Sequence, residues 1–166
     1  MQHNFTLRAI LLSLTLALLS FVQAMAQPEG ANLAYPIEAG QLQFGASFTD
    51  TRNNHPTNGF GNDMFNNESD DIFYRFSLNH AATVQVSHCS SQIDTYLYIL
   101  DEAGNVITSL DDNGPACSSL QASLQVGLQP GTYYAVSEGY SSVYGDITTE
   151  ISLISNSQAA EGIYMS

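Results

Sequence analysis

The chain has 166 residues, of which 16 are Asp or Glu and only three are Lys or Arg, and its formal net charge at pH 7 is −13. A surface with this charge repels phosphate backbones and anionic lipid headgroups, so the composition argues against binding to nucleic acids or to anionic membranes. Divalent cations are the natural counter-partners of such a surface, although acidity also serves simply to keep an exported protein soluble.

Residues 1–26 have the layout of a secretory signal peptide, with Arg8 near the start, an apolar run over 9–22 and the small-residue site Ala24-Met25-Ala26. A membrane anchor is the rival interpretation, but a spanning helix needs about 20 apolar residues. Gln23 interrupts this run early. We expect cleavage after Ala26 and a mature chain that is secreted, periplasmic or at the cell surface, without stable membrane insertion.

The mature chain is predicted to contain a lead-in segment over 27–40, a single β-sandwich domain over 41–155 and a C-terminal tail over 156–166. At the start of the domain, apolar and polar residues alternate over 41–47, which is typical of a half-buried strand. The polar stretch over 49–71 is rich in Asn, Asp, Gly and Thr, and we expect it to form a surface loop.

From Asp71 onward, short runs rich in β-branched and aromatic residues alternate with turn residues. The expected strands are 72–78, 83–88, 95–101, 106–110, 120–128, 132–139 and 147–154. No stretch after the signal peptide shows the apolar periodicity of a helix. The pattern therefore predicts an all-β fold, a jelly-roll-like antiparallel β-sandwich that follows an N-terminal signal helix.

The chain contains two cysteines, Cys89 and Cys117. An even number of cysteines in an exported chain predicts a disulfide. A metal site at these thiols is disfavoured, because the four histidines do not stand at ligand spacing. We expect the bond to stabilise the fold by closing a long loop.

Five residues with hard oxygen atoms are candidate calcium ligands. Asp94 opens one expected strand and Asp101 closes it, whereas Asp111, Asp112 and Asn113 follow the return strand of the same hairpin. Asp94 and the 111–113 loop should therefore share one end of the sandwich, with Asp101 at the hairpin turn. Calcium takes about six to eight oxygen ligands, and no other cofactor is expected. The alternative is that Asp-Asp-Asn-Gly-Pro serves only as a turn.

Tyrosines gather near the C-terminal strands, and Tyr140 and Tyr144 lie among Ser and Gly residues. Exposed aromatic rings can stack on sugars or on partner chains, so these two residues are candidate ligand contacts. The alternative is that they belong to the core or to pairs between strands.

Catalytic motifs are absent from the sequence: there is no G-x-S-x-G, no H-E-x-x-H and no Gly-rich phosphate loop. A set drawn from Ser87, His88 and Asp94 has no motif to support it. A carboxylate pair for glycoside hydrolysis, such as Glu138 with Asp146, remains open. We therefore expect a protein that is not an enzyme.

Five segments, in this order, carry a resemblance to a known family. They are D-I-F-Y-R-F-S-L (71–78), A-T-V-Q-V-S (82–87), D-T-Y-L-Y-I-L-D (94–101), L-D-D-N (110–113) and L-Q-P-G-T-Y-Y-A-V (128–136). Together they resemble the bacterial pre-peptidase C-terminal domain over about 71–153. S-H-C (87–89), the second cysteine and V-S-E-G-Y-S-S (136–142) look like a variant at the front of RHS-type surface proteins of Bacteroidetes-like bacteria.

The resemblance implies a jelly-roll-like β-sandwich that accompanies secreted proteins without being their catalytic part. Some members of that family bind calcium, and some bind insoluble polymers such as collagen or polysaccharide. The sequence thus predicts a non-catalytic exported module that supports, stabilises or targets a larger secreted or cell-surface protein, with protein or polysaccharide partners. A free-standing lectin-like or adhesin-like module that binds carbohydrate or protein is the alternative.

Overall fold

The computed structural model describes residues 27–65 and 67–156, so the predicted signal peptide and nearly all of the predicted tail lie outside it. The described strands are β1 (Ile37–Gln41), β2 (Ser47–Asn53), β3 (Ile72–Leu78), β4 (Ala82–Ser87), β5 (Thr95–Asp101), β6 (Val106–Leu110), β7 (Ser123–Leu128), β8 (Gly131–Gly139) and β9 (Asp146–Asn156). The described residues also contain one helical element, a 3-10 turn, η1 (Pro56–Asn58). No helix in this part of the chain is long and apolar enough to cross a membrane.

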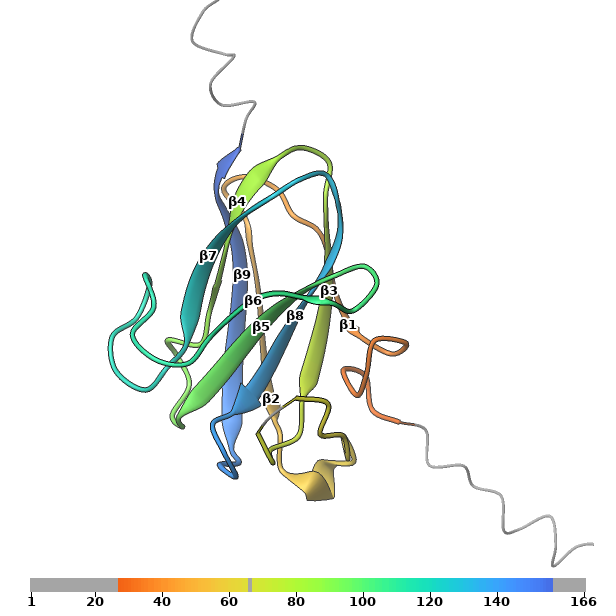
Figure 1. Ribbon diagram of the computed structural model, residues 1–166, viewed down its shortest axis with the longest axis vertical. Coiled ribbons are helices and arrows are strands. Elements are labelled where there is room, and N and C mark those ends of the chain that lie inside the picture. The colour runs from red at the N-terminus through yellow and green to blue at the C-terminus, as the bar shows by residue number, and fades with distance from the viewer. Residues whose placement is uncertain (1–26, 66, 157–166) are drawn as a thin grey trace, which may run out of the picture.

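The strands form two sheets that pack face to face (Figure 1). One sheet has five strands in the order β1-β3-β8-β5-β6, and the other has four in the order β2-β9-β4-β7. Neighbouring strands are antiparallel except for β1 and β3, which are parallel. The predicted all-β sandwich is confirmed.

The main core lies between the two sheets and follows from the alternation of side chains along each strand. Tyr74 and Phe76 of β3 point inward, as the sequence predicts, and are almost completely buried. The facing sheet contributes Val84 from β4 together with Ile147 and Ile151 from β9. Each such side chain stabilises the fold by about 1.5–3 kcal/mol through burial, so the interior is filled by apolar groups.

A second, smaller apolar cluster lies on the outer face of the five-stranded sheet. It contains Phe73, Tyr98, Leu100, Tyr134 and Val136. Segments outside the strands cover it: Leu33 packs against it, and the ring of Phe65 stacks on Tyr98 with centroids 4.2 Å apart. Parts of β3, β5 and β8 are therefore buried on both faces, which explains the continuous apolar runs over 72–74, 96–100 and 133–136.

The predicted strand over 41–47 is wrong. Strand β1 ends at Gln41, β2 begins at Ser47, and the chain between them turns through Gly45 at φ 83°. Leu42 is buried and Phe44 is 58% exposed, so the two residues do not share a face. Glycine is the residue that reaches positive φ without strain. The alternation of apolar and polar residues carries no information about this turn, which is why it wrongly predicts a strand here.

The predicted polar loop over 49–71 is correct only in its later part. Strand β2 runs through Asn53 and pairs with β9 along its whole length. Its outward-facing side chains are polar, and Phe48 packs against the core. An edge strand with a single apolar contact resembles a loop in composition, which is why the sequence did not reveal it.

The predicted disulfide between Cys89 and Cys117 is confirmed. Cys89 follows β4, and Cys117 lies in the long loop between β6 and β7. The bond therefore ties this loop to the end of a central strand of the four-stranded sheet.

Replacing both cysteines, Cys89→Ser with Cys117→Ser, is expected to lower the free energy of unfolding by about 3 kcal/mol. The reason is that the bond spans 28 residues and restricts the unfolded chain. Chemical denaturation followed by circular dichroism measures the change. Ser90→Ala, at the exposed neighbour of Cys89, is the matched control and should leave the midpoint unchanged. A double variant as stable as the wild type would contradict the expected role of the bond.

Candidate functional site

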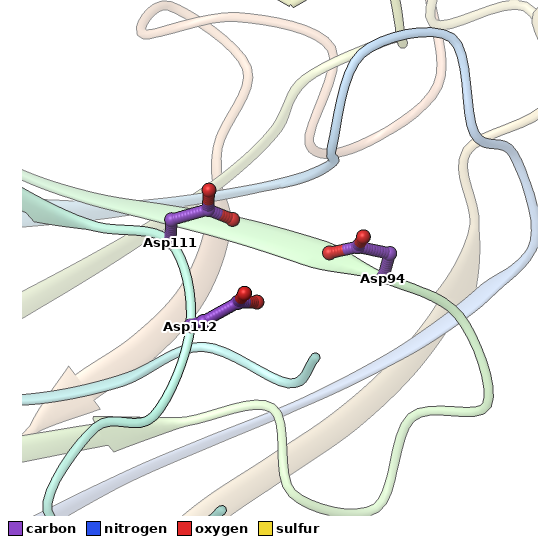
Figure 2. Close-up of side chains that lie close together, drawn as sticks. All are labelled: Asp94, Asp111 and Asp112. Carbon is purple, nitrogen blue, oxygen red and sulfur yellow. The ribbon is translucent and has the colours of Figure 1, made fainter. Parts of the chain in front are cut away.

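Three carboxylates meet at one end of the sandwich, as the sequence predicts for Asp94 and the 111–113 loop. Asp94 immediately precedes β5, while Asp111 and Asp112 immediately follow β6, and the two strands are antiparallel neighbours. One oxygen from each side chain lies within 4.8 Å of the others. Figure 2 shows the three carboxylates pointing toward one another.

The negative charges of the cluster are not neutralised by other side chains of the described residues. One carboxylate oxygen of each of Asp94, Asp111 and Asp112 is shielded from solvent and accepts no hydrogen bond. Partial burial, followed by the negative charge of Asp112, raises the pKa of both Asp94 and Asp111. Within the described residues, both arginines pair elsewhere, Arg52 with Asp50 and Glu29 and Arg75 with Glu38. The cluster is therefore without a basic partner from the described chain and favours the approach of a cation.

The other two predicted calcium ligands have local roles in turns. Asp101 lies at the β5–β6 turn, on the opposite side of the molecule from the 111–122 loop (Figure 1). Its carboxylate accepts hydrogen bonds from the backbone and side-chain nitrogens of Asn105, which lower its pKa. Asn113 adopts φ 54°, and its side-chain oxygen accepts a bond from Ser119 N at 3.1 Å. Of the five candidate ligands, the structure therefore brings three close together through their carboxylates, namely Asp94, Asp111 and Asp112.

Tyr140 and Tyr144, the two candidate ligand contacts, differ in their surroundings. The backbone N–H of Tyr140 donates to the carbonyl oxygen of Asp94 at 3.1 Å, and its side chain is 43% exposed. The hydroxyl of Tyr144 donates to the carbonyl oxygen of Glu68, and its ring lies edge-on to His55 at 5.5 Å. Tyr140 thus contacts Asp94 through its backbone and has a partly exposed side chain, whereas Tyr144 anchors a loop.

A serine and a histidine do meet in the structure, but inside the core. His88 Nε2 lies 2.7 Å from Ser137 Oγ, and Ser137 Oγ lies 2.8 Å from Thr149 Oγ1. All three side chains are fully buried, and burial lowers the pKa of His88 to about 3, so its ring is neutral. The hydroxyl that His88 contacts is that of Ser137, not that of its sequence neighbour Ser87. A substrate cannot reach this group without opening the sandwich.

The carboxylate pair suggested for glycoside hydrolysis has no shared cleft in the structure. Glu138 is fully buried, whereas Asp146 is exposed and accepts a hydrogen bond from Asn53 Nδ2 at 2.7 Å. Glu138 instead accepts a hydrogen bond from Asn67 and lies beside Asp71. Neither Asp71 nor Asn67 stands out in the sequence as a candidate site residue. Their proximity to Glu138 depends on the register between β3 and β8, which the sequence pattern does not specify.

No family model and no curated protein match this chain. Among solved structures, it is similar to the pre-peptidase C-terminal domain of a collagenase from Bacillus anthracis, with 16% identity over 71% of this chain and 93% of that chain and a TM-score of 0.46. It is also similar to PliG, a periplasmic inhibitor of g-type lysozyme from Aeromonas hydrophila, with 10% identity over 71% of this chain and 98% of that chain and a TM-score of 0.39. The first of these belongs to the family that the sequence resembles; the narrower resemblance to RHS-associated variants stays a prediction.

Replacing Asp112 with Asn should raise the free energy of unfolding by up to about 1 kcal/mol when divalent cations are removed with EDTA. The reason is that like charges about 4 Å apart at a wet surface repel by roughly that amount. Thermal melting at low ionic strength measures the effect, and added salt should reduce it. Glu150→Gln removes an exposed carboxylate of β9 and serves as the control for net charge. If Asp112→Asn is no more stable than that control, the three carboxylates do not strain one another.

Proposed function

We propose that this chain is an exported, non-catalytic β-sandwich module that supports, stabilises or targets a larger secreted or cell-surface protein, and that it takes up calcium at Asp94, Asp111 and Asp112. The observation that carries the proposal is the convergence of three carboxylate oxygens within 4.8 Å, each residue having an oxygen without a hydrogen-bond partner. Such a cluster is costly without a counter-charge and becomes a stabilising contact once a cation enters.

The non-catalytic part of the proposal rests on the filled interior. Large side chains such as Tyr74, Phe76 and Ile99 occupy the space between the sheets. The buried polar side chains described above, those of His88, Ser137 and Thr149, are fully enclosed and linked to one another. Groups arranged in this way support the packing of a scaffold rather than the binding of a substrate.

Calcium suits the cluster better than magnesium. Calcium accepts six to eight oxygens in a flexible geometry, so backbone carbonyls and water can complete a set that begins with three carboxylates. Bound there, the ion would join the start of β5 to the loop after β6. The same loop carries Cys117, so the disulfide and the ion would together hold it against both sheets. A fixed loop gives a module a defined surface for a partner protein.

One observation favours a second function, a lectin-like module that binds carbohydrate. The backbone N–H of Tyr140 donates to the carbonyl oxygen of Asp94, a residue of the carboxylate cluster, and the Tyr140 side chain is 43% exposed. A partly exposed aromatic residue is therefore joined to the residue that opens β5. Aromatic rings stack on the apolar faces of sugars, and a bound cation can hold sugar hydroxyls. This function would use the same end of the sandwich as the calcium site.

Calcium is expected to raise the melting temperature of the wild type. At 100 times the dissociation constant, binding adds about 2.7 kcal/mol to the free energy of unfolding. Asp112→Asn should abolish most of this increase. Asp101→Asn, which changes a carboxylate at the far turn, should retain it and is the matched control. Differential scanning calorimetry with calcium and with EDTA measures all three proteins.

A wild type whose melting temperature does not move at millimolar calcium contradicts the calcium site. The two effects of Asp112→Asn have opposite signs, since it stabilises the protein in EDTA and removes the gain in calcium. General destabilisation by the substitution cannot produce both.

If the carbohydrate function is correct, Tyr140→Ala should reduce retention on insoluble polysaccharides at least about tenfold, because the loss of a stacked ring costs on the order of 1.5 kcal/mol. Retention is measured by depletion from solution in the presence of calcium. Tyr35→Ala removes a comparably exposed ring in the lead-in segment and is the control. Equal retention of both variants and the wild type leaves the supporting module as the function.

A further inference from the structure

Asp71 and Glu138 form a cross-strand pair of acids at the end of the β3–β8 ladder. Ile72 pairs with Ser137 in the antiparallel register, so the preceding Asp71 falls opposite the following Glu138. Asp71 is two residues from Phe73, and Glu138 is two residues from Val136, so the two acids lie on the same face as these apolar residues. That face is the outer face of the five-stranded sheet. Like charges at directly opposed positions destabilise a sheet, so this placement requires a compensating interaction.

The pair is sealed from solvent. Asp71 and Glu138 are each 0% exposed, and residues of the ranges 59–65 and 67–70 contact them. Asn67 Nδ2 donates to Glu138 Oε1, and Met64 N donates to Asp71 Oδ2 at 2.8 Å. Phe65, between these two anchors, stacks on Tyr98 of β5. The described residues 59–65 and 67–70, hereafter the covering loop, are thus attached to the sheet through the two acids and the aromatic ring beside them.

One oxygen on each acid is left without a partner. Asp71 Oδ1 and Glu138 Oε2 are buried and accept no hydrogen bond from any donor in the described residues. The arginines of this part of the chain pair with other carboxylates, so neither supplies a counter-charge. A single proton satisfies both oxygens at once, since the protonated acid donates to the ionised one.

Acidic groups near the pair favour its protonation. Asp63 and Asp70 of the covering loop add negative charge near Asp71. From β5, Tyr98 lies beside Glu138, and Tyr96 is the register partner of Glu138. The two aspartates raise the pKa of Asp71 by their negative charge, whereas hydrogen bonding to Tyr98 lowers the pKa of Glu138. The charged neighbours of the pair therefore favour its protonated form.

We infer that Asp71 and Glu138 share one proton, and that this proton latches the covering loop onto the outer aromatic face, so that its loss in alkaline solution releases the loop. With both acids ionised, two negative charges would stand opposed in a site without water, and the loop must lift to hydrate them. Release would expose the apolar cluster that Phe65 covers. The latch is distinct from the calcium cluster, which lies at the ends of β5 and β6.

The direction of the pH dependence follows from burial. Burial, above all, raises the pKa of Asp71 to about 6 and that of Glu138 to about 9. Because both pKa values are raised in the folded state, the pair stabilises the fold fully below the ordinary carboxyl range. That contribution declines as the pH rises through the raised values. The first proton leaves near pH 6 and the shared proton near pH 9, so the loop should open as the pH rises through about 9.

Phe65→Trp provides a local reporter, because the chain contains no other Trp. We expect its emission to shift to longer wavelength in an alkaline transition while far-ultraviolet circular dichroism stays constant. Adding Glu138→Gln should abolish the transition, since the amide donates to Asp71 and does not titrate. Adding Glu150→Gln, at an exposed position, should leave it unchanged. A transition that persists with the same midpoint in Glu138→Gln overturns the inference.

Two further measurements keep the inference open to refutation if Glu138→Gln folds poorly. The infrared spectrum of the wild type at neutral pH should contain the carbonyl band of a protonated carboxylic acid, and its absence overturns the shared proton. The midpoint of the reporter transition should be the same in EDTA and in millimolar calcium. A midpoint that moves with calcium shows that the pair holds a cation instead of a proton.

Discussion

The chain brings carboxylates together without supplying basic side chains to neutralise them. Sixteen acidic residues stand against three basic ones, and the two arginines in the described part of the chain are already paired with other carboxylates. Wherever the strands place acids side by side, the compensating positive charge must come from outside the chain. A metal ion and a proton are the two candidates, and the surroundings of each cluster decide between them.

Burial separates the two cases. Asp94, Asp111 and Asp112 sit at the rim of the sandwich, where an ion can arrive with its water and find further oxygen ligands. Asp71 and Glu138 are enclosed, and amide donors already occupy their other oxygens. A proton needs no additional ligands and fits between two orphaned oxygens. We therefore propose that the same acidic composition forms an ion site at the rim and a shared proton beneath a loop.

The sequence predicted those features that depend on local pattern. The strands over 95–101 and 106–110 were predicted with their observed bounds, because strong alternation surrounds a short turn, and that hairpin brought Asp94 toward Asp111. Features that depend on tertiary pairing were not predicted. Strand β1 pairs in parallel with β3 through backbone groups that carry no side-chain signature, and the pairing of Asp71 with Glu138 requires the β3–β8 register. Composition shows that acids are numerous but not which of them meet.

Carbon-13 NMR of the Asp and Glu carboxyl groups, recorded across a pH titration with and without calcium, tests this account of the unpaired acids most directly. Calcium is expected to shift the resonances of Asp94, Asp111 and Asp112. Asp71 and Glu138 are expected to retain one proton at neutral pH, and their resonances should not change when calcium is added. Ordinary titration of Asp71 and Glu138 near pH 4, the range of unperturbed carboxyl groups, would contradict this account. So would a shift of their resonances on addition of calcium.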